Sequence, residues 1–122
     1  MSATLLIIDD EESIRDSLSG ILGDEGFNAI TAASAEEGLK MLAQADIDLV
    51  LLDIWMPGMD GIEELQAIKT YHPEIEVLVM SGHGTIDTAV KATKLGAYDF
   101  IERPFSLDQL VLAVEKARKQ RK

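Results

Sequence analysis

The chain has 122 residues, of which 47% are hydrophobic, and this composition is sufficient for one domain with a sizeable core over residues 1–122. Its formal net charge of −11 argues against a surface for nucleic acid or an anionic membrane, because both demand a basic face, so we expect no direct binding to either. The absence of cysteine excludes a disulfide framework and a thiolate metal site.

The N-terminal part of the chain leads into a predicted strand and helix. Residues 1–4 lack the basic flank and the long apolar segment of a signal peptide, and no apolar run approaches the roughly 20 residues that cross a bilayer. We therefore expect a cytoplasmic protein. Residues 4–8 form an aliphatic run that ends in Asp9 and Asp10, which is typical of a buried strand with acids at its carboxyl end. The next residues predict an amphipathic helix with the stripe Ile14, Leu18, Ile21 and Leu22.

A second strand and helix follow with weaker signals. Gly26 is a stop signal for the first helix, and residues 28–32 form a shorter, less apolar run that predicts an edge strand. Ser34 and Glu37 have the spacing of a capping box, which predicts that the second helix begins here.

The strongest strand signal lies in the middle of the chain. Residues 49–52 are four consecutive aliphatic residues that lead into Asp53, and such a run predicts a strand buried on both faces. The Pro57-Gly58 pair is expected to stop any regular element soon after this strand. An aspartate alone at such a place is also typical of a strand end or a turn cap, so the role of Asp53 depends on what lies beside it.

The second half of the chain repeats the alternation of strand and helix. Its predicted elements are a helix over 61–71, a buried strand over 76–80, a helix over 85–95, an edge strand over 98–102 and a last helix. Ser106 and Gln109 have the capping-box spacing that opens this last helix. The helix over 85–95 has the weakest apolar stripe, so we expect it to be held least firmly.

Five strands that alternate with five helices predict an α/β fold, a flavodoxin-like doubly wound (βα)5 domain with a five-stranded parallel sheet. The three most aliphatic strands should be central and the two weaker ones should lie at the edges. The order 2-1-3-4-5 meets this condition. It places the switch point between the first and third strands, where ligands bind in such sheets. These strands are the ones that end in Asp9-Asp10 and in Asp53.

Convergent carboxylates at this switch point predict a metal site and phosphoryl chemistry. The carboxylates of Asp9, Asp10 and Asp53 cannot all remain ionised in one crevice at low cost without a cation. Their hard oxygen atoms suit Mg²⁺, and an aspartate beside Mg²⁺ can attack a phosphoryl group to form an aspartyl phosphate. Asp53 is the candidate nucleophile. In the remaining loops, Ser81 is a candidate hydroxyl donor and Arg103 is a candidate positive charge.

Motifs along the whole chain resemble the receiver domain of two-component response regulators. The matching segments are Ile8-Asp9-Asp10-Glu11, residues 51–61, residues 80–84, residues 96–100 and Arg103-Pro104-Phe105. The stretches after Met80 and around Tyr98 are most similar to enhancer-binding transcription activators of the nitrogen-regulator type. The resemblance implies a phosphorylation-switched signalling module rather than an enzyme, because such domains catalyse only their own phosphoryl transfer and dephosphorylation.

The resemblance also implies roles for individual residues in phosphoryl transfer. Asp53 would accept a phosphoryl group from a phosphohistidine of a sensor histidine kinase. Asp10 would bind Mg²⁺ directly and Asp9 would bind it largely through water. Asp53 and the backbone carbonyl of Trp55 would complete the protein's share of the ligands.

A switch is the second implication of the resemblance. Ser81 would hydrogen-bond a phosphoryl oxygen, and Tyr98 would change its exposure as Ser81 moves inward. The fourth helix, fifth strand and fifth helix would form the face that makes a homodimer on activation and controls a transcriptional output domain. Receivers normally have Lys where this chain has Arg103, and the planar guanidinium group of Arg places its hydrogen-bond donors at a different distance from the backbone. We therefore expect phosphorylation to survive at this position and switching to be incomplete.

Alternatives remain for the function and for the basic end of the chain. A Mg²⁺-dependent phosphohydrolase would also use an aspartyl phosphate, but such enzymes often carry an acid two residues after the nucleophile, where this chain has Trp55. A flavin-binding module would need a phosphate-binding loop with Ser, Thr or Gly after the first strand, whereas this chain has acidic residues there, which repel phosphate. Residues 116–122 hold five of the eleven basic residues, and they read either as favourable cations at a helix C-terminus or as a linker to an output domain.

Overall fold

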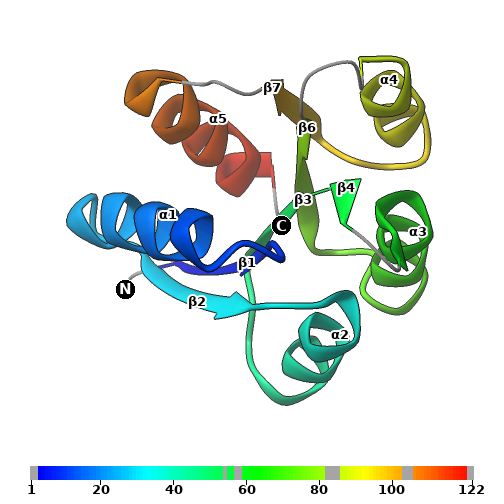
Figure 1. The fold of residues 1–122 in the computed structure, drawn as a ribbon, viewed down its shortest axis with the longest axis horizontal. Coiled ribbons are helices and arrows are strands. Elements are labelled where there is room, and N and C mark those ends of the chain that lie inside the picture. Colours follow the sequence, from blue (N-terminus) through cyan, green and yellow to red (C-terminus); the bar gives the residue numbers. More distant parts are fainter. Residues whose placement is uncertain (1–2, 54, 57–58, 82–85, 103–105, 121–122) are drawn as a thin grey trace.

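The structure is a computed structural model of the 122-residue chain, and it describes residues 3–53, 55–56, 59–81, 86–102 and 106–120. Within these ranges the chain forms one main sheet with helices on both of its faces (Figure 1). No helix in the described part of the chain is both long enough and apolar enough to cross a bilayer.

The main sheet is parallel, with the strand order β2-β1-β3-β6-β7. Its strands are β1 (Thr4–Ile8), β2 (Asn28–Ala32), β3 (Leu49–Asp53), β6 (Glu76–Ser81) and β7 (Asp99–Glu102). Since β6 and β7 are the fourth and fifth strands of this sheet, the predicted order 2-1-3-4-5 is confirmed. The central strands are the most aliphatic ones, and all five residues of β3 are buried, as expected for a strand covered on both faces.

The helices are α1 (Glu12–Asp24), α2 (Ala35–Gln44), α3 (Gly61–Tyr71), α4 (Ile86–Lys94) and α5 (Leu107–Gln120). Figure 1 shows α1 and α5 on one face of the sheet and α2, α3 and α4 on the other. Because successive side chains of a strand point to opposite faces, the sheet divides the core into two clusters. Leu5 and Ile7 of β1 belong to the α1/α5 cluster, whereas Leu6 and Ile8 belong to the α2/α3/α4 cluster.

Local signals set most helix boundaries as predicted. Gly26 and Gly96 follow α1 and α4 with φ angles of 93° and 117°, a backbone region that favours glycine. Ser106 and Gln109 form a complete capping box, in which each side chain binds the other residue's backbone amide at 3.1 and 3.0 Å. At α2 the Ser34 hydroxyl accepts the Glu37 amide at 3.1 Å.

The region after Asp53 differs from the prediction. The Pro57-Gly58 pair was expected to stop regular structure, but β4 (Trp55–Met56) pairs antiparallel with β5 (Met59–Asp60) across it. Two residues between paired strands is the length of a tight hairpin connection. The sequence did not predict these two short strands, although β4 does end at Met56, directly before Pro57. Residues 57–58 themselves lie outside the described residues.

An acidic side chain, Glu64, lies in the core between α3, α2 and the end of β1. It is 0% exposed, and neither carboxylate oxygen has a hydrogen-bond partner among the residues that the structure describes. A Cβ atom at Gly38 of α2 would lie 3.7 Å from its Oε1 and 2.5 Å from the Cδ1 of Ile8, so α2 is in close contact at this point. Burial raises the pKa of Glu64 from its ordinary value of 4.5 to about 7.

This raised pKa makes the stability of the fold depend on pH in a defined direction. The folded chain keeps the proton of Glu64 at pH values where the unfolded chain has released it. The stabilising contribution of the protonated group is therefore complete below pH 4.5 and is lost as the pH rises through about 7. The unfolding free energy falls by about 3 kcal/mol over this range, because a difference of one in pKa corresponds to about 1.4 kcal/mol.

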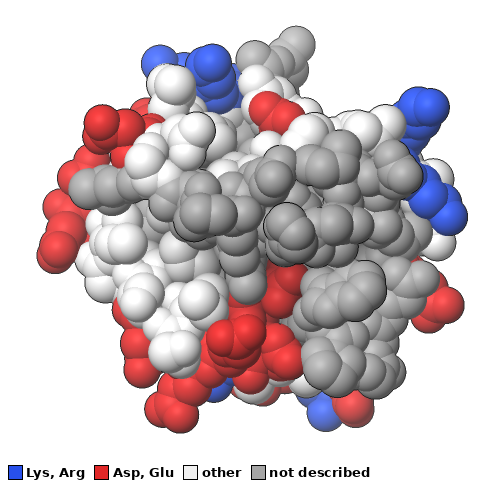
Figure 2. All heavy atoms as spheres, turned by 45° about the horizontal axis from the view of Figure 1, so that its top comes forward, with Lys and Arg blue, Asp and Glu red and all other residues white. Residues whose placement is uncertain are grey.

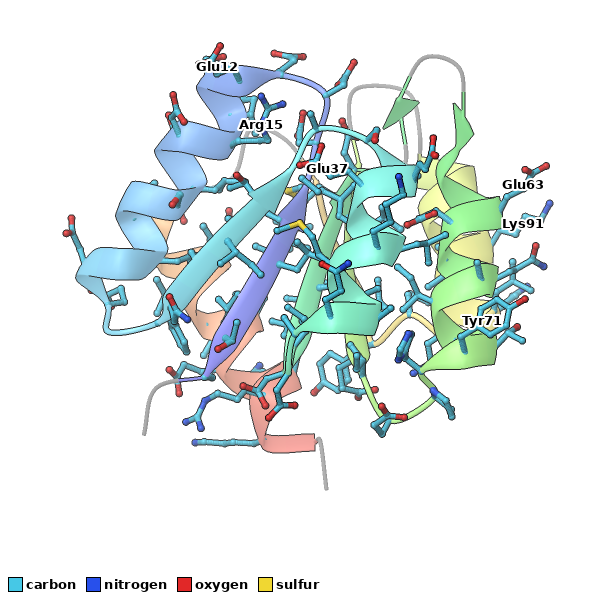
Figure 3. All side chains as sticks on the ribbon, turned by 90° about the horizontal axis from the view of Figure 1, so that it is seen from below. Glu12, Arg15, Glu37, Glu63, Tyr71 and Lys91 are labelled. Carbon is cyan, nitrogen blue, oxygen red and sulfur yellow. The ribbon has the colours of Figure 1, made fainter. Side chains whose placement is uncertain are left out.

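We expect Glu64→Gln to gain stability over the parent as the pH rises, because the amide cannot ionise. The difference in unfolding free energy should grow by up to about 3 kcal/mol between about pH 5 and pH 8, as measured by urea unfolding. Glu63→Gln is the matched control, since Glu63 is exposed on the outer side of α3 (Figure 3). A difference that stays constant over this pH range would contradict the assignment.

Candidate functional site

Two adjacent strands bring the predicted acids to one edge of the sheet. Asp53 is the last residue of β3, and Asp9 follows β1 directly. Because Ile8 is paired in parallel with Leu52, the chain leaves the two strands side by side. Asp10 is the next residue of the turn into α1. The switch point inferred from the strand order therefore carries all three carboxylates.

The three carboxylates form a compact acidic cluster. One oxygen atom from each of Asp9, Asp10 and Asp53 lies within 4.8 Å of the others. Asp9 is 0% and Asp53 is 3% exposed, whereas Asp10 is exposed, so the cluster is open to solvent on the side of Asp10. Figure 2 shows acidic atoms gathered on the lower half of this face, with basic atoms at its rims. Such a cluster favours a cation.

Backbone groups hold Asp9 in place between β1 and α1. Its carboxylate Oδ1 accepts the amide of Glu11 at 2.9 Å, which is an Asx-type turn at the start of α1. Its own amide donates to the Ala32 carbonyl of β2 at 3.2 Å, and its carbonyl accepts a hydrogen bond from the Arg15 guanidinium at 2.8 Å. The orientation of Asp9 is therefore fixed by contacts to three other residues.

The donor set fits a hard divalent cation such as Mg²⁺. All three groups are carboxylates, and Mg²⁺ binds oxygen ligands at about 2.0–2.1 Å, so opposite ligands lie about 4 Å apart. The upper limit of 4.8 Å between the oxygen atoms is only slightly larger than this separation. A small inward shift or one bridging water would bring these carboxylates to a single ion, and Asp9, Asp10 and Asp53 are the residues that would hold it.

The other predicted site residues are described only in part. The backbone of Ser81 ends β6, one residue beyond Met80, which pairs with Asp53, so Ser81 lies at the same edge of the sheet. The backbone of Trp55 lies in β4, directly after this edge. Arg103 lies outside the described residues.

Tyr98 precedes β7 and is partly buried against the α1/α5 cluster. Its amide donates to the Val77 carbonyl of β6 at 2.8 Å, so its backbone is tied to the neighbouring strand. The structure therefore places Tyr98 between the interior and the surface, at the start of the edge strand. Its predicted change of exposure remains a prediction.

Arg15 was not among the residues singled out from the sequence. It lies on α1, and Figure 3 shows it at the same end of the molecule as Glu12, near the carboxyl end of β1. The only signal in the sequence is a cation one turn after the acidic run of residues 9–12. Such a cation is equally typical of a solvated helix face, so the contact with Asp9 required the structure.

Comparison with known proteins finds relatives that match almost the whole chain. Residues 5–115 match the family model of the response regulator receiver domain. The nitrogen assimilation regulatory protein NtrX of Azorhizobium caulinodans is 50% identical over 119 residues, which cover 96% of this chain and 26% of that protein. This chain spans about a quarter of the length of that protein and of the NtrX-like response regulator of Rickettsia bellii, which is also 50% identical.

Two solved structures are similar over nearly their whole length. The crystal structure of the receiver domain of NtrX from Brucella abortus has a TM-score of 0.92 and 47% identity, and the match covers 95% of this chain and 98% of that chain. The solution structure of the beryllofluoride-activated NtrC4 receiver domain dimer has a TM-score of 0.91 and 42% identity, and 98% of each chain is covered. The similarity therefore extends over almost the whole fold.

We expect Asp10→Asn to stabilise the metal-free protein by about 1 kcal/mol, because it removes one of three adjacent like charges. The same change should reduce the additional stabilisation that Mg²⁺ gives, since it removes a charged oxygen ligand. Thermal unfolding with a chelator and with excess Mg²⁺ measures both effects. Asp24→Asn, at the opposite end of α1, is the control and should leave the Mg²⁺ effect unchanged. Equal Mg²⁺ stabilisation of Asp10→Asn and the parent would remove Asp10 from the metal site.

Proposed function

The chain belongs to the response regulator receiver domain family, and from this premise we propose that Asp53 is its phosphoacceptor. One observation carries the assignment: Asp53 ends the central strand β3, nearly buried, with the carboxylates of Asp9 and Asp10 beside it. An acid that accepts a phosphoryl group needs a fixed position and nearby groups that hold a cation. Asp53 meets both conditions.

The proposed reaction transfers a phosphoryl group from a phosphohistidine of a sensor histidine kinase. A carboxylate oxygen of Asp53 attacks the phosphorus atom, and the bond between phosphorus and the imidazole nitrogen breaks. The electron pair of that bond returns to the imidazole, and the product is an aspartyl phosphate. Mg²⁺, when bound, would neutralise charge on the phosphoryl oxygens. Asp9 and Asp10 would hold this ion with Asp53 and the carbonyl of Trp55.

Two further residues are proposed to respond to the phosphoryl group. Ser81, at the carboxyl end of β6, would donate its hydroxyl to a phosphoryl oxygen. Arg103, the residue that follows Glu102 in the sequence, would supply a positive charge in place of the Lys that is usual in the family. The planar guanidinium group of Arg places its donors differently from the ammonium group of Lys. We therefore propose that phosphorylation proceeds but that the phosphoryl group is coupled more weakly to the rest of the domain.

The output face would consist of α4, β7 and α5. Among the described residues, two of the three large hydrophobic side chains that are exposed lie there: Val90 of α4, at 41%, and Leu112 of α5, at 56%. Tyr98 lies at the start of β7, between these helices along the chain. Exposed apolar groups beside an edge strand are suited to self-association. The proposed homodimer on activation, and control of a transcriptional output domain, would use this face.

Family membership identifies the chain as a signalling module. We propose that its catalysis is limited to its own phosphorylation and dephosphorylation, and that residues 1–122 act as one receiver domain. The basic end of α5, with Arg118 and Lys119 in its last turn, would lead toward an output domain. The phosphohydrolase alternative gains no support from the described residues.

Asp53→Asn should abolish uptake of a phosphoryl group from acetyl phosphate in the presence of Mg²⁺, while the fold remains intact. The amide is nearly isosteric with the carboxylate, but it is not a nucleophile for phosphorus. Intact-mass measurement detects the gain of one phosphoryl group, and circular dichroism checks the fold. Asp24→Asn should be labelled like the parent. Mg²⁺-dependent labelling of Asp53→Asn at the parent level would refute the assignment.

Activation with beryllofluoride should change hydrogen exchange over residues 85–110 and promote dimerisation. The reason is that the two conformations of the output face are expected to differ in free energy by only a few kcal/mol, so that activation can move the population from one to the other. Hydrogen exchange with mass spectrometry and sedimentation velocity measure the two effects. Asp53→Asn treated in the same way is the control and should show neither. Unchanged exchange over this range in the parent would show that the switch lies elsewhere.

A further inference from the structure

The Arg15 side chain connects α1 with the residue that leads into the acidic cluster. Its Nη1 donates to the backbone carbonyl of Asp9 at 2.8 Å, across six positions of the chain. The side chain is half-buried, and Figure 3 shows it at the carboxyl end of β1. A guanidinium that binds a carbonyl acts on the backbone directly, so the contact bears on geometry as well as on charge.

The carbonyl of Asp9 belongs to the same planar peptide unit as the amide of Asp10. A hydrogen bond to this carbonyl therefore limits the rotation of the peptide plane, and the plane sets the direction in which the Asp10 side chain leaves the backbone. The Asp9 carboxylate is fixed separately, by the Glu11 amide at 2.9 Å. The Arg15 contact is thus a side-chain hydrogen bond that acts directly on the peptide between the two acids.

Arg15 is itself held by the helix. Its backbone amide donates to the carbonyl of Glu11 at 3.1 Å, and Glu11 in turn binds Asp9. The bonds among Asp9, Glu11 and Arg15 form a closed ring that joins the end of β1 to the start of α1. A closed ring of bonds resists displacement of any one member more than a single contact does.

We propose that Arg15 is a positioning residue that orients the Asp9–Asp10 peptide and so prepares Asp10 to bind a divalent cation. The proposal rests on the proposed function for the role of that cation. A purely electrostatic role makes the opposite prediction. A positive charge beside the site repels Mg²⁺, so its removal would strengthen binding, whereas loss of the orienting bond weakens binding.

The decisive comparison is between Arg15→Met, which keeps the apolar stem and removes the donor, and Arg15→Lys, which keeps a charged donor. We expect Arg15→Met to weaken Mg²⁺ binding about 10-fold in isothermal titration calorimetry, since loss of an outer partner of a metal ligand typically costs 10- to 100-fold. Arg15→Lys should recover most of the affinity. Arg118→Met is the matched control, because Arg118 pairs with Glu115 at 3.4 Å on α5, and it should bind Mg²⁺ like the parent.

A metal-free measurement tests the orienting bond by itself. In the presence of a chelator, Arg15→Met should increase hydrogen exchange of the amides of residues 9–12, and Arg118→Met should not. Mg²⁺ affinity of Arg15→Met equal to or higher than that of the parent would overturn the proposal. A parent that takes up neither Mg²⁺ nor a phosphoryl group would instead overturn the proposed function, and the exchange result would still decide whether Arg15 orders the turn.

Discussion

The parallel pairing of β1 with β3 is the constraint on which the site depends. Ile8 pairs with Leu52, so the acids after these residues meet at one edge. At the other end of the strands, the amide of Thr4 donates to the Asp48 carboxylate at 2.7 Å, and the Asp48 amide donates to the Thr4 carbonyl at 2.8 Å. Burial of the aliphatic strands and these end contacts hold carboxylates together although Coulomb repulsion opposes their approach.

Much of this arrangement could be predicted because its signals are local. An aliphatic run predicts a buried strand wherever it occurs, and the capping pairs and glycines mark helix ends within a few residues. The more aliphatic strands are then assigned to the centre of the sheet and the less aliphatic ones to its edges, and the strand order follows from this assignment. Convergence of Asp9 and Asp53 required only that order, since parallel strands end at the same edge.

The features that could not be predicted depend on contacts between distant segments. Glu64 lies four residues before the buried Ile68, which is a same-face spacing in a helix, but charged residues are almost never fully buried, so the sequence predicts exposure of its side chain. Its burial depends on tertiary contacts such as the one with Gly38 of α2, and the sequence of α3 alone does not reveal them. The hairpin after Asp53 was missed because the same Pro-Gly pair can end one element or join two. Arg15 gained significance only when its partner proved to be a backbone carbonyl.

The separation of the core into an α1/α5 cluster and an α2/α3/α4 cluster has a consequence for how the sequence can diverge. The sheet lies between them, so a large-to-small change such as Leu22→Ala on one face shares few neighbours with Leu42→Ala on the other. Energetic costs of such distant changes are close to additive, whereas changes within one cluster are coupled. Each face can therefore accumulate compensating substitutions on its own. Drift in the packing of α2 and α3 therefore leaves the packing of α1 and α5 on the other face largely unaffected.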